Sequence, residues 1–148
     1  MPKIMRMLNI ISRCQSLYRN EKMPNSEIKA CHHSFIFAIC NHPGMSQDQI
    51  SQSICLNKST VARTLNNLEE NGYIIRRVSE SDKRATLVYP SEKMLEIFPR
   101  IKEISEEWNN KISLNISPGE MDIFMSVLSR ISTQAKVIVG NGEGESKK

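Results

Sequence analysis

Hydrophobic side chains near the start of the chain recur every three or four residues, which is the spacing of one face of a helix. They are Ile4, Leu8, Ile11, Cys14 and Tyr18. Met23 and Pro24 interrupt this spacing, so we expect the helix to end there. A second helix should follow, capped from Asn25 or Ser26 and ended by residues 42–44. Its apolar face is formed by Ile28, Cys31, Phe35 and Ile39.

The next segment predicts two short helices joined by a tight turn. Ser46 and Gln49 form a capping box, which indicates a helix over 47–54. Asn57 is a favourable N-cap for the following helix, and Gly72 can supply the left-handed residue that ends it. The buried face of this second helix should consist of Val61, Leu65 and Leu68. Two short helices connected in this way are typical of a helix-turn-helix.

Residues 73–89 predict a β-hairpin. The stretches "YIIRRV" and "ATLVY" are short and rich in β-branched and aromatic residues, and the polar "SESDKR" between them suits a turn. A hairpin placed directly after the second helix would form a wing.

Two helices should complete the chain. The first, over 92–113, carries Met94, Phe98, Ile101, Trp108 and Ile112 on one face. Pro99 should kink it, because proline removes an N–H and clashes with the preceding turn. Ser117 and Glu120 form a second capping box at the start of the last helix. This helix should bury Met121, Phe124, Leu128 and Ile131. The glycine-rich and charged tail, 140–148, should be disordered.

The helix that starts after Asn57 carries the groups needed to read a DNA major groove. Such a helix exposes short donors, acceptors and cations near its N-terminus while its other face anchors it on the domain. Arg63 has the fork geometry that suits a phosphate or a guanine edge. The alternative is a solvated N-cap followed by an ordinary surface cation. The candidate DNA-binding residues are Ser46, Gln47, Asn57, Lys58, Ser59, Thr60, Arg63, Asn66, Asn67, Arg76, Lys83 and Arg84.

The tip of the wing contains Asp82 two residues before Arg84. Pairing between these side chains could rigidify the loop and direct the cation into a minor groove. An exposed ion pair contributes only about 0.2 to 1 kcal/mol, so this pair would orient the arginine more than it would stabilise the fold. The alternative is an ordinary polar turn.

Three stretches resemble the MarR family of winged-helix transcriptional regulators. They are "PGMSQDQISQSI", "STVARTLNNLEENGYIIRR" and "SDKRATLVYPSEKM". The resemblance implies an obligate homodimer that reads a pseudo-palindromic operator. It also implies that Thr60 and Arg63 touch DNA, and that Arg84 enters the minor groove with Asp82 as the residue that orients it.

The expected fold is mainly α with a small β wing. We expect one domain over 1–139, in which a winged helix-turn-helix lobe at 28–90 is flanked by dimerisation helices at 1–23 and 92–139. The terminal helices carry more apolar side chains than one small lobe needs, which favours self-association, although an intramolecular core is the alternative. The predicted dimer interface consists of Ile4, Leu8, Ile11, Trp108, Ile112, Met121, Phe124 and Leu128.

Composition narrows the class of protein. The chain has 148 residues, of which 39% are hydrophobic, enough for one domain with a core. Its net charge of +4 suggests affinity for a polyanion only where the charge is clustered. The longest apolar run, 35–40, is too short for a membrane span, and the N-terminus does not resemble a signal peptide. We therefore expect a cytoplasmic protein.

A sensing site is harder to predict. The cysteines, at 14, 31, 40 and 55, form no CxxC pair, so we expect reduced thiols that are mostly small core residues. Cys14 could sense oxidants, but an inert buried thiol is the favoured interpretation. His32 and His33 point about 100° apart on a helix and cannot form an i, i+4 metal clamp. We expect satisfied or partly exposed histidines and no metal or cofactor, although a site shared with Cys14 or Cys31 is the alternative.

The sequence also bears on two other classes of function. The sequence lacks HExxH, a glycine-rich phosphate loop, GxSxG and CxxC, so we expect no enzymatic activity. A winged helix that binds protein instead of DNA is the rival, because fold alone does not fix function. The resemblance favours a repressor that responds to a small-molecule effector.

Overall fold

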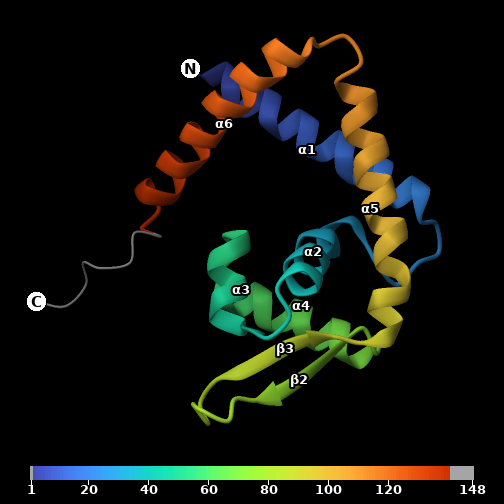
Figure 1. The fold of residues 1–148 in the computed structure, drawn as a ribbon, viewed down its shortest axis with the longest axis vertical. Coiled ribbons are helices and arrows are strands. Elements are labelled where there is room, and N and C mark those ends of the chain that lie inside the picture. The colour runs from blue at the N-terminus through green and yellow to red at the C-terminus, as the bar shows by residue number, and fades with distance from the viewer. Residues whose placement is uncertain (1, 141–148) are drawn as a thin grey trace, which may run out of the picture. The chain divides into compact units, whose positions relative to one another are not determined.

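The computed structural model describes residues 2–140, and they form a mainly helical fold with a small antiparallel sheet (Figure 1). Most of the tail for which disorder was predicted lies outside the described residues. The chain divides into two compact units, 1–109 and 110 onward. The helices and strands are α1 (Pro2–Lys22), the 3-10 helix η1 (Ala30–His32), α2 (His33–Asn41), β1 (Met45–Ser46), α3 (Gln47–Ile54), α4 (Lys58–Glu70), β2 (Ile74–Val78), β3 (Thr86–Pro90), α5 (Glu92–Ile112) and α6 (Pro118–Ile138).

The predicted helix-turn-helix is confirmed as α3 and α4. Ser46 Oγ accepts the backbone N–H of Gln49 at 3.1 Å, and Gln49 Oε1 accepts the N–H of Ser46 at 2.8 Å. Between the helices, Cys55 adopts a left-handed conformation with φ 54°. The side chain of Asn57 then caps α4 by accepting the N–H of Thr60 at 2.8 Å.

The predicted hairpin is also confirmed, and it belongs to a larger sheet. Gly72, with φ +76°, ends the turn after α4, and β2 pairs antiparallel with β3 from Ile74 opposite Pro90 to Val78 opposite Thr86. The two-residue strand β1 pairs with the other edge of β3, which gives the order β1-β3-β2. Sequence reasoning missed β1, because two residues are too few to show an alternating pattern.

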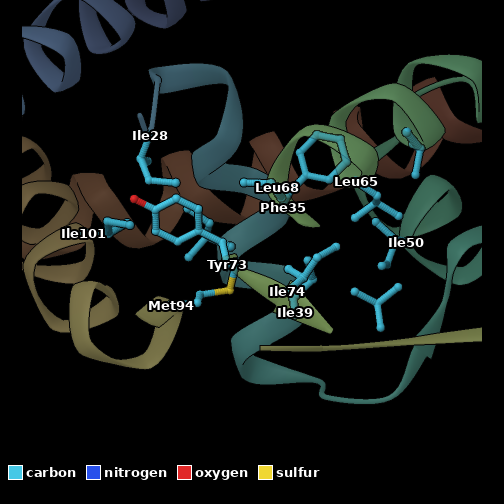
Figure 2. Close-up of a cluster of buried hydrophobic side chains, with 13 residues drawn as sticks. Ile28, Phe35, Ile39, Ile50, Leu65, Leu68, Tyr73, Ile74, Met94 and Ile101 are labelled. Atoms are coloured by element: carbon cyan, nitrogen blue, oxygen red, sulfur yellow. The ribbon is translucent and has the colours of Figure 1, made fainter. Parts of the chain in front are cut away.

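The core of the first unit lies where α2, α3, α4, the sheet and α5 meet (Figure 2). The buried face of α4 is the predicted one, formed by Val61, Leu65 and Leu68. Phe35 and Ile39 of α2 and Met94 and Ile101 of α5 pack into the same cluster. The lobe therefore has a core of its own, to which the start of α5 contributes.

The second helix begins later than predicted. Asn25 has φ +60°, and Ser26 Oγ accepts the N–H of Ile28 at 3.0 Å, so these polar residues stabilise a turn rather than a helix start. Ile28 is buried but precedes η1, and Cys31 is exposed. The helical spacing was misleading here because a loop and a 3-10 turn can also bring Ile28 onto the core.

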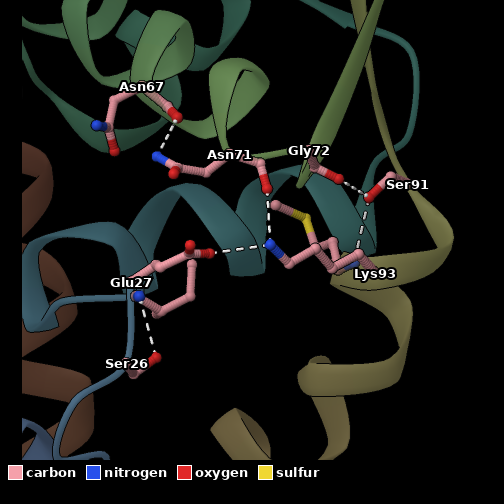
Figure 3. Close-up of polar contacts among 9 residues, drawn as sticks. Ser26, Glu27, Asn67, Asn71, Gly72, Ser91 and Lys93 are labelled. Carbon is pink, nitrogen blue, oxygen red and sulfur yellow. Dashed lines mark hydrogen bonds and ion pairs between the residues drawn. The ribbon is translucent and has the colours of Figure 1, made fainter.

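The helix α5 is continuous across Pro99. Its first turns are held by an interaction of Lys93 with two other segments (Figure 3). Lys93 Nζ lies 2.9 Å from Glu27 Oε2, donates to the carbonyl of Asn71 at 2.8 Å, and lies 4.2 Å from the centre of the Tyr73 ring. Hydrogen bonding from Lys93 lowers the pKa of Glu27. Lys93 thus ties α5 to the end of α4 and to the segment before α2.

The last helix, α6, has no buried residue. The prediction that it buries Met121, Phe124, Leu128 and Ile131 is therefore wrong for the single chain: Phe124 keeps 49% of its surface exposed and Ile131 keeps 38%. The capping box is nevertheless formed as predicted, with Ser117 and Glu120 exchanging hydrogen bonds. The local helix signals are correct, but they do not show what covers the apolar face of α6.

Candidate nucleic-acid interface

The N-terminal half of α4 presents polar and basic side chains to solvent. Lys58, Ser59 and Arg63 are exposed and Thr60 is partly exposed, whereas the stripe from Val61 to Leu68 is buried. The burial of one face fixes the helix on the lobe and leaves the other face open. This is the arrangement that a helix needs to enter a major groove.

Several of the predicted DNA-binding residues also interact with one another or with α3 at the start of α4. Asn57 Oδ1 accepts the Ser59 hydroxyl at 2.8 Å in addition to the N–H of Thr60. Lys58 Nζ lies 3.2 Å from a carboxylate oxygen of Asp48 on α3, and both side chains remain mostly exposed, at 75% and 64%. An ion pair this exposed exchanges easily with solvent, so Lys58 stays available. No sequence signal pointed to Asp48.

Arg76 on β2 and Asn66 on the C-terminal half of α4 contact each other. Arg76 Nε and Nη2 both donate to Glu69 Oε2, at 2.9 and 2.5 Å, and Nη2 also donates to Asn66 Oδ1 at 2.6 Å. Hydrogen bonding from Arg76 lowers the pKa of Glu69. Both residues were predicted DNA contacts, but here their polar groups are bound to each other and to Glu69.

At the wing tip, Asp82 organises the turn through the backbone. Its carboxylate Oδ1 accepts the N–H of Arg84 at 3.0 Å, its carbonyl accepts the N–H of Ala85 at 2.9 Å, and its own N–H donates to Ser79 Oγ at 3.3 Å. The predicted pairing of Asp82 with Arg84 thus involves the main chain of Arg84, and the Arg84 side chain is exposed. Ser79, buried at 8% exposure, was missed, although serine is one of the residues that favour turns.

The structure brings the start of α3 and the wing tip together around an open polar cavity of about 410 Å³. Its walls are formed by Ser46, Gln47, Asp48, Asp82, Arg84, Ala85 and Thr86. Three of the predicted DNA-binding residues therefore line one cavity: Ser46, Gln47 and Arg84. Of the remaining predicted contacts, Lys83 lies exposed at the wing tip and Asn67 lies exposed on α4.

The cysteines do not occupy the core positions expected of them. Cys14, Cys31 and Cys55 are exposed and Cys40 is partly buried. The interpretation of Cys14 as a buried thiol is wrong for the single chain, because α1 leaves that face uncovered. Burial raises the pKa of the Cys40 thiol to about 11, which disfavours the reactive thiolate.

The two adjacent histidines are both buried but differ in their bonding. His32 Nδ1 accepts the N–H of Lys29 at 3.2 Å, as expected of a satisfied histidine. His33 Nδ1 has no hydrogen-bond partner among the described residues, and neither does Arg19 Nε. Burial, together with the positive charge of Arg19, lowers the pKa of His33 to about 4.

The described residues hold neither a cluster of metal ligands nor a helix suited to span a membrane. Over residues 2–140, no cluster of three or more His, Cys, Asp or Glu side chains could hold a metal ion. Within that same part of the chain, no helix combines the length and hydrophobicity needed to cross a bilayer.

Comparison with known proteins gives a consistent result. Residues 32–86 match the model of the MarR family. The chain is 21% identical over 131 residues to the uncharacterized HTH-type transcriptional regulator YybA of Bacillus subtilis (strain 168), covering 88% of this chain and 87% of that protein. Proteins of the MarR family are transcriptional regulators and not enzymes, which agrees with the expectation from sequence.

Solved structures show the same fold. A putative MarR family regulator from Listeria monocytogenes, complexed with 26mer DNA, superposes with a TM-score of 0.85 at 21% identity, over 97% of each chain. The PcaV regulator from Streptomyces coelicolor, in complex with its natural ligand, gives 0.76 at 19% identity over 87% of this chain and 91% of that one. At these identities the likeness shows the fold alone.

Proposed function

Because the chain is a MarR-family transcriptional regulator, with 32–86 as the segment that matches the family, we propose that it binds a pseudo-palindromic operator as a homodimer. In this proposal α4 enters the major groove and the hairpin of β2 and β3 reaches the adjacent minor groove. The regulator acts as a repressor in the cytoplasm and responds to a small-molecule effector.

One observation carries the DNA-binding proposal: the open side of α4 and the exposed Arg84 belong to one lobe that buries the opposite side of α4. Arg63 and Lys58 lie on that open side, and Arg84 lines the cavity beside the start of α3. Helix N-termini and arginine side chains both favour phosphate oxygens. A lobe of this kind can contact two neighbouring grooves without changing its core.

The exposed apolar side chains of α1 and α6 support the homodimer. Met7 and Leu17 of α1 are 62% and 70% exposed, and Ile123 and Phe124 of α6 are 69% and 49% exposed. Apolar surface of this extent is stabilised by burial against a partner. A dimer would present two recognition helices to successive major grooves, about 34 Å apart.

The unsatisfied polar atoms of Arg19 and His33 support a polar effector. Leaving a buried donor or acceptor without a partner costs about 1–3 kcal/mol, so a ligand that bonds to these atoms recovers that cost. The effector would act by binding the DNA-free arrangement of the dimer more tightly than the DNA-bound one. An effector that leaves the DNA affinity unchanged contradicts this part of the proposal.

The test is a salt titration of purified protein on a labelled duplex from its own upstream intergenic DNA, with a scrambled duplex of equal length as reference. We expect preferential binding to the upstream duplex and a steep loss of affinity with salt. Arg63→Ala and Arg84→Ala should each weaken binding by about tenfold or more and leave the dimer intact. Equal, weak binding to both duplexes would instead favour a module that binds protein.

A further inference from the structure

One network of polar contacts on the lobe surface joins the wing to the recognition helix. Arg76 lies on β2, and its guanidinium bonds to Glu69 and Asn66 on the C-terminal half of α4. Two of its nitrogens meet the same carboxylate oxygen, Glu69 Oε2, at 2.9 and 2.5 Å. We call this arrangement of Arg76, Glu69 and Asn66 the wing strut.

Burial distinguishes the strut from the other ion pair near the DNA-reading side. The Arg76 side chain is 21% exposed and that of Glu69 is 41% exposed. Lys58 and Asp48, by contrast, are 75% and 64% exposed and share one contact of 3.2 Å. A partly buried arginine with several hydrogen bonds exchanges its partner less readily than a fully solvated lysine. Lys58 can therefore turn to a phosphate while Arg76 stays bound.

The charge of the strut leads to the same conclusion. Salt dependence of DNA binding arises when a cation replaces a counterion on a phosphate. Arg76 is already paired with the carboxylate of Glu69, so the pair adds almost no net charge to the surface. Moving Arg76 to a phosphate would break its bonds to Glu69 and Asn66 and leave the Glu69 carboxylate without its partner, near DNA of the same charge.

We infer that Glu69 is a positioning residue that holds Arg76 on α4, so that Arg76 fixes the wing against the recognition helix and does not bind a phosphate. This inference rests on the proposed function and assigns Arg76 and Asn66 a different role from direct DNA contact. The strut determines the spacing between the two groove-reading elements of one lobe. Arg63 and Arg84 remain the arginines that face the nucleic acid.

The experiment compares full-length wild type with Glu69→Gln, Arg76→Gln and the control Arg84→Gln in salt titrations on the upstream and scrambled duplexes. Arg84→Gln should reduce the slope of log affinity against log salt by about one. Arg76→Gln should leave that slope unchanged and lower the preference for the upstream duplex. Glu69→Gln should release Arg76, steepen the slope by up to about one, and strengthen binding to the scrambled duplex.

Two results of the salt titrations overturn the inference. One is a slope reduction with Arg76→Gln as large as that with Arg84→Gln, because Arg76 would then contact a phosphate. The other is a Glu69→Gln protein with the wild-type slope, because the carboxylate would then restrain no cation. A Glu69 that only stabilised the fold would lower the melting temperature without steepening the slope.

The test of the wing strut can fail or succeed independently of the test of operator binding. If wild type binds both duplexes equally, the operator proposal fails, yet the slopes of the variants can still be compared on either duplex. The strut itself is measured without DNA from the Arg76 Nε–H resonance in nuclear magnetic resonance spectra. We expect slow solvent exchange in wild type and fast exchange in Glu69→Gln, and equal exchange in both proteins overturns the inference.

Discussion

The winged lobe and the last helix follow the same local rules but differ in what surrounds them. Both α3 and α6 begin with a capping box, Ser46 with Gln49 and Ser117 with Glu120. The lobe then buries its apolar side chains among α2, α3, α4, the sheet and α5, whereas no residue of α6 is buried. Helix formation is thus encoded locally in both regions, but only the lobe contains its own packing partners. The stability of the lobe should be intrinsic, and that of α6 should depend on association.

The largest effect should come from the core of the lobe. Phe35 is 1% exposed at the centre of the cluster, so Phe35→Ala should lower the free energy of unfolding by about 3–5 kcal/mol, through lost burial and the cavity left behind. The measurement is urea denaturation. Leu95→Ala, at a position 50% exposed on α5, is the control and should change the free energy by less than about 0.5 kcal/mol. Equal losses in the two variants would mean that the lobe is not the stable unit.

A charge on the apolar face of α6 should separate association from folding. Phe124→Glu should raise the dissociation constant of the dimer by about thirtyfold or more, equivalent to ~2 kcal/mol, and leave the lobe folded. Sedimentation equilibrium measures the association, and circular dichroism reports the fold. Ser129→Glu adds the same charge to the same helix outside the row of Met121, Phe124 and Leu128, and should leave the dimer intact. A dimer unaffected by Phe124→Glu would exclude this face from the interface.

The two capping boxes allow a matched comparison. Ser46→Ala and Ser117→Ala each remove a side-chain acceptor from a helix start, which costs about 1 kcal/mol. Ser46→Ala should destabilise the whole lobe, because α3 is part of its core, and Ser117→Ala should speed hydrogen exchange only in the first turns of α6. Faster exchange throughout the lobe in Ser117→Ala would show that α6 and the lobe unfold together.

The smallest effect should be a dependence of lobe stability on pH, measured between pH 7 and 6. His33 has a pKa of about 4 in the folded protein against 6.5 for the unperturbed group. The unfolded chain therefore binds the proton first, and stability should fall as the pH decreases from about 6.5 towards 4. His33→Gln should make the urea midpoint less sensitive to pH between pH 7 and 6, where only the first part of this loss is sampled. An unchanged pH dependence in His33→Gln would assign the effect to other groups.

The parts of the fold that could be predicted are those with strong local signals. Ser46, Asn57 and Gly72 marked the boundaries of α3 and α4, and the β-branched runs after Gly72 marked the hairpin. The start of α2 was missed because Ile28 reaches the core from a loop. The exposure of Cys14 and of α6 was missed because periodicity shows that a helix has an apolar face but not what covers it.

The sequence predicted which helix and hairpin form the candidate site, but it predicted few of the contacts between their side chains. The spacing along α4 placed Lys58, Thr60 and Arg63 off the buried stripe, as the structure has them. The partner of Arg76 could not be predicted, because Glu69 is seven residues away and meets it only when β2 packs beside α4. We expected the Asp82 carboxylate to pair with the Arg84 side chain, but in the structure it accepts the backbone N–H of Arg84. Turn geometry decides between these two partners, and the spacing of the residues in the sequence does not.

The most direct test of the account is the stoichiometry of the complex. Native mass spectrometry of the full-length protein with a duplex from its own upstream intergenic DNA, with a scrambled duplex as competitor, counts the protomers on each DNA. The account predicts two protomers on the upstream duplex and little occupancy of the scrambled one. A single bound protomer, or equal occupancy of both duplexes, would contradict a dimer of winged lobes that reads an operator.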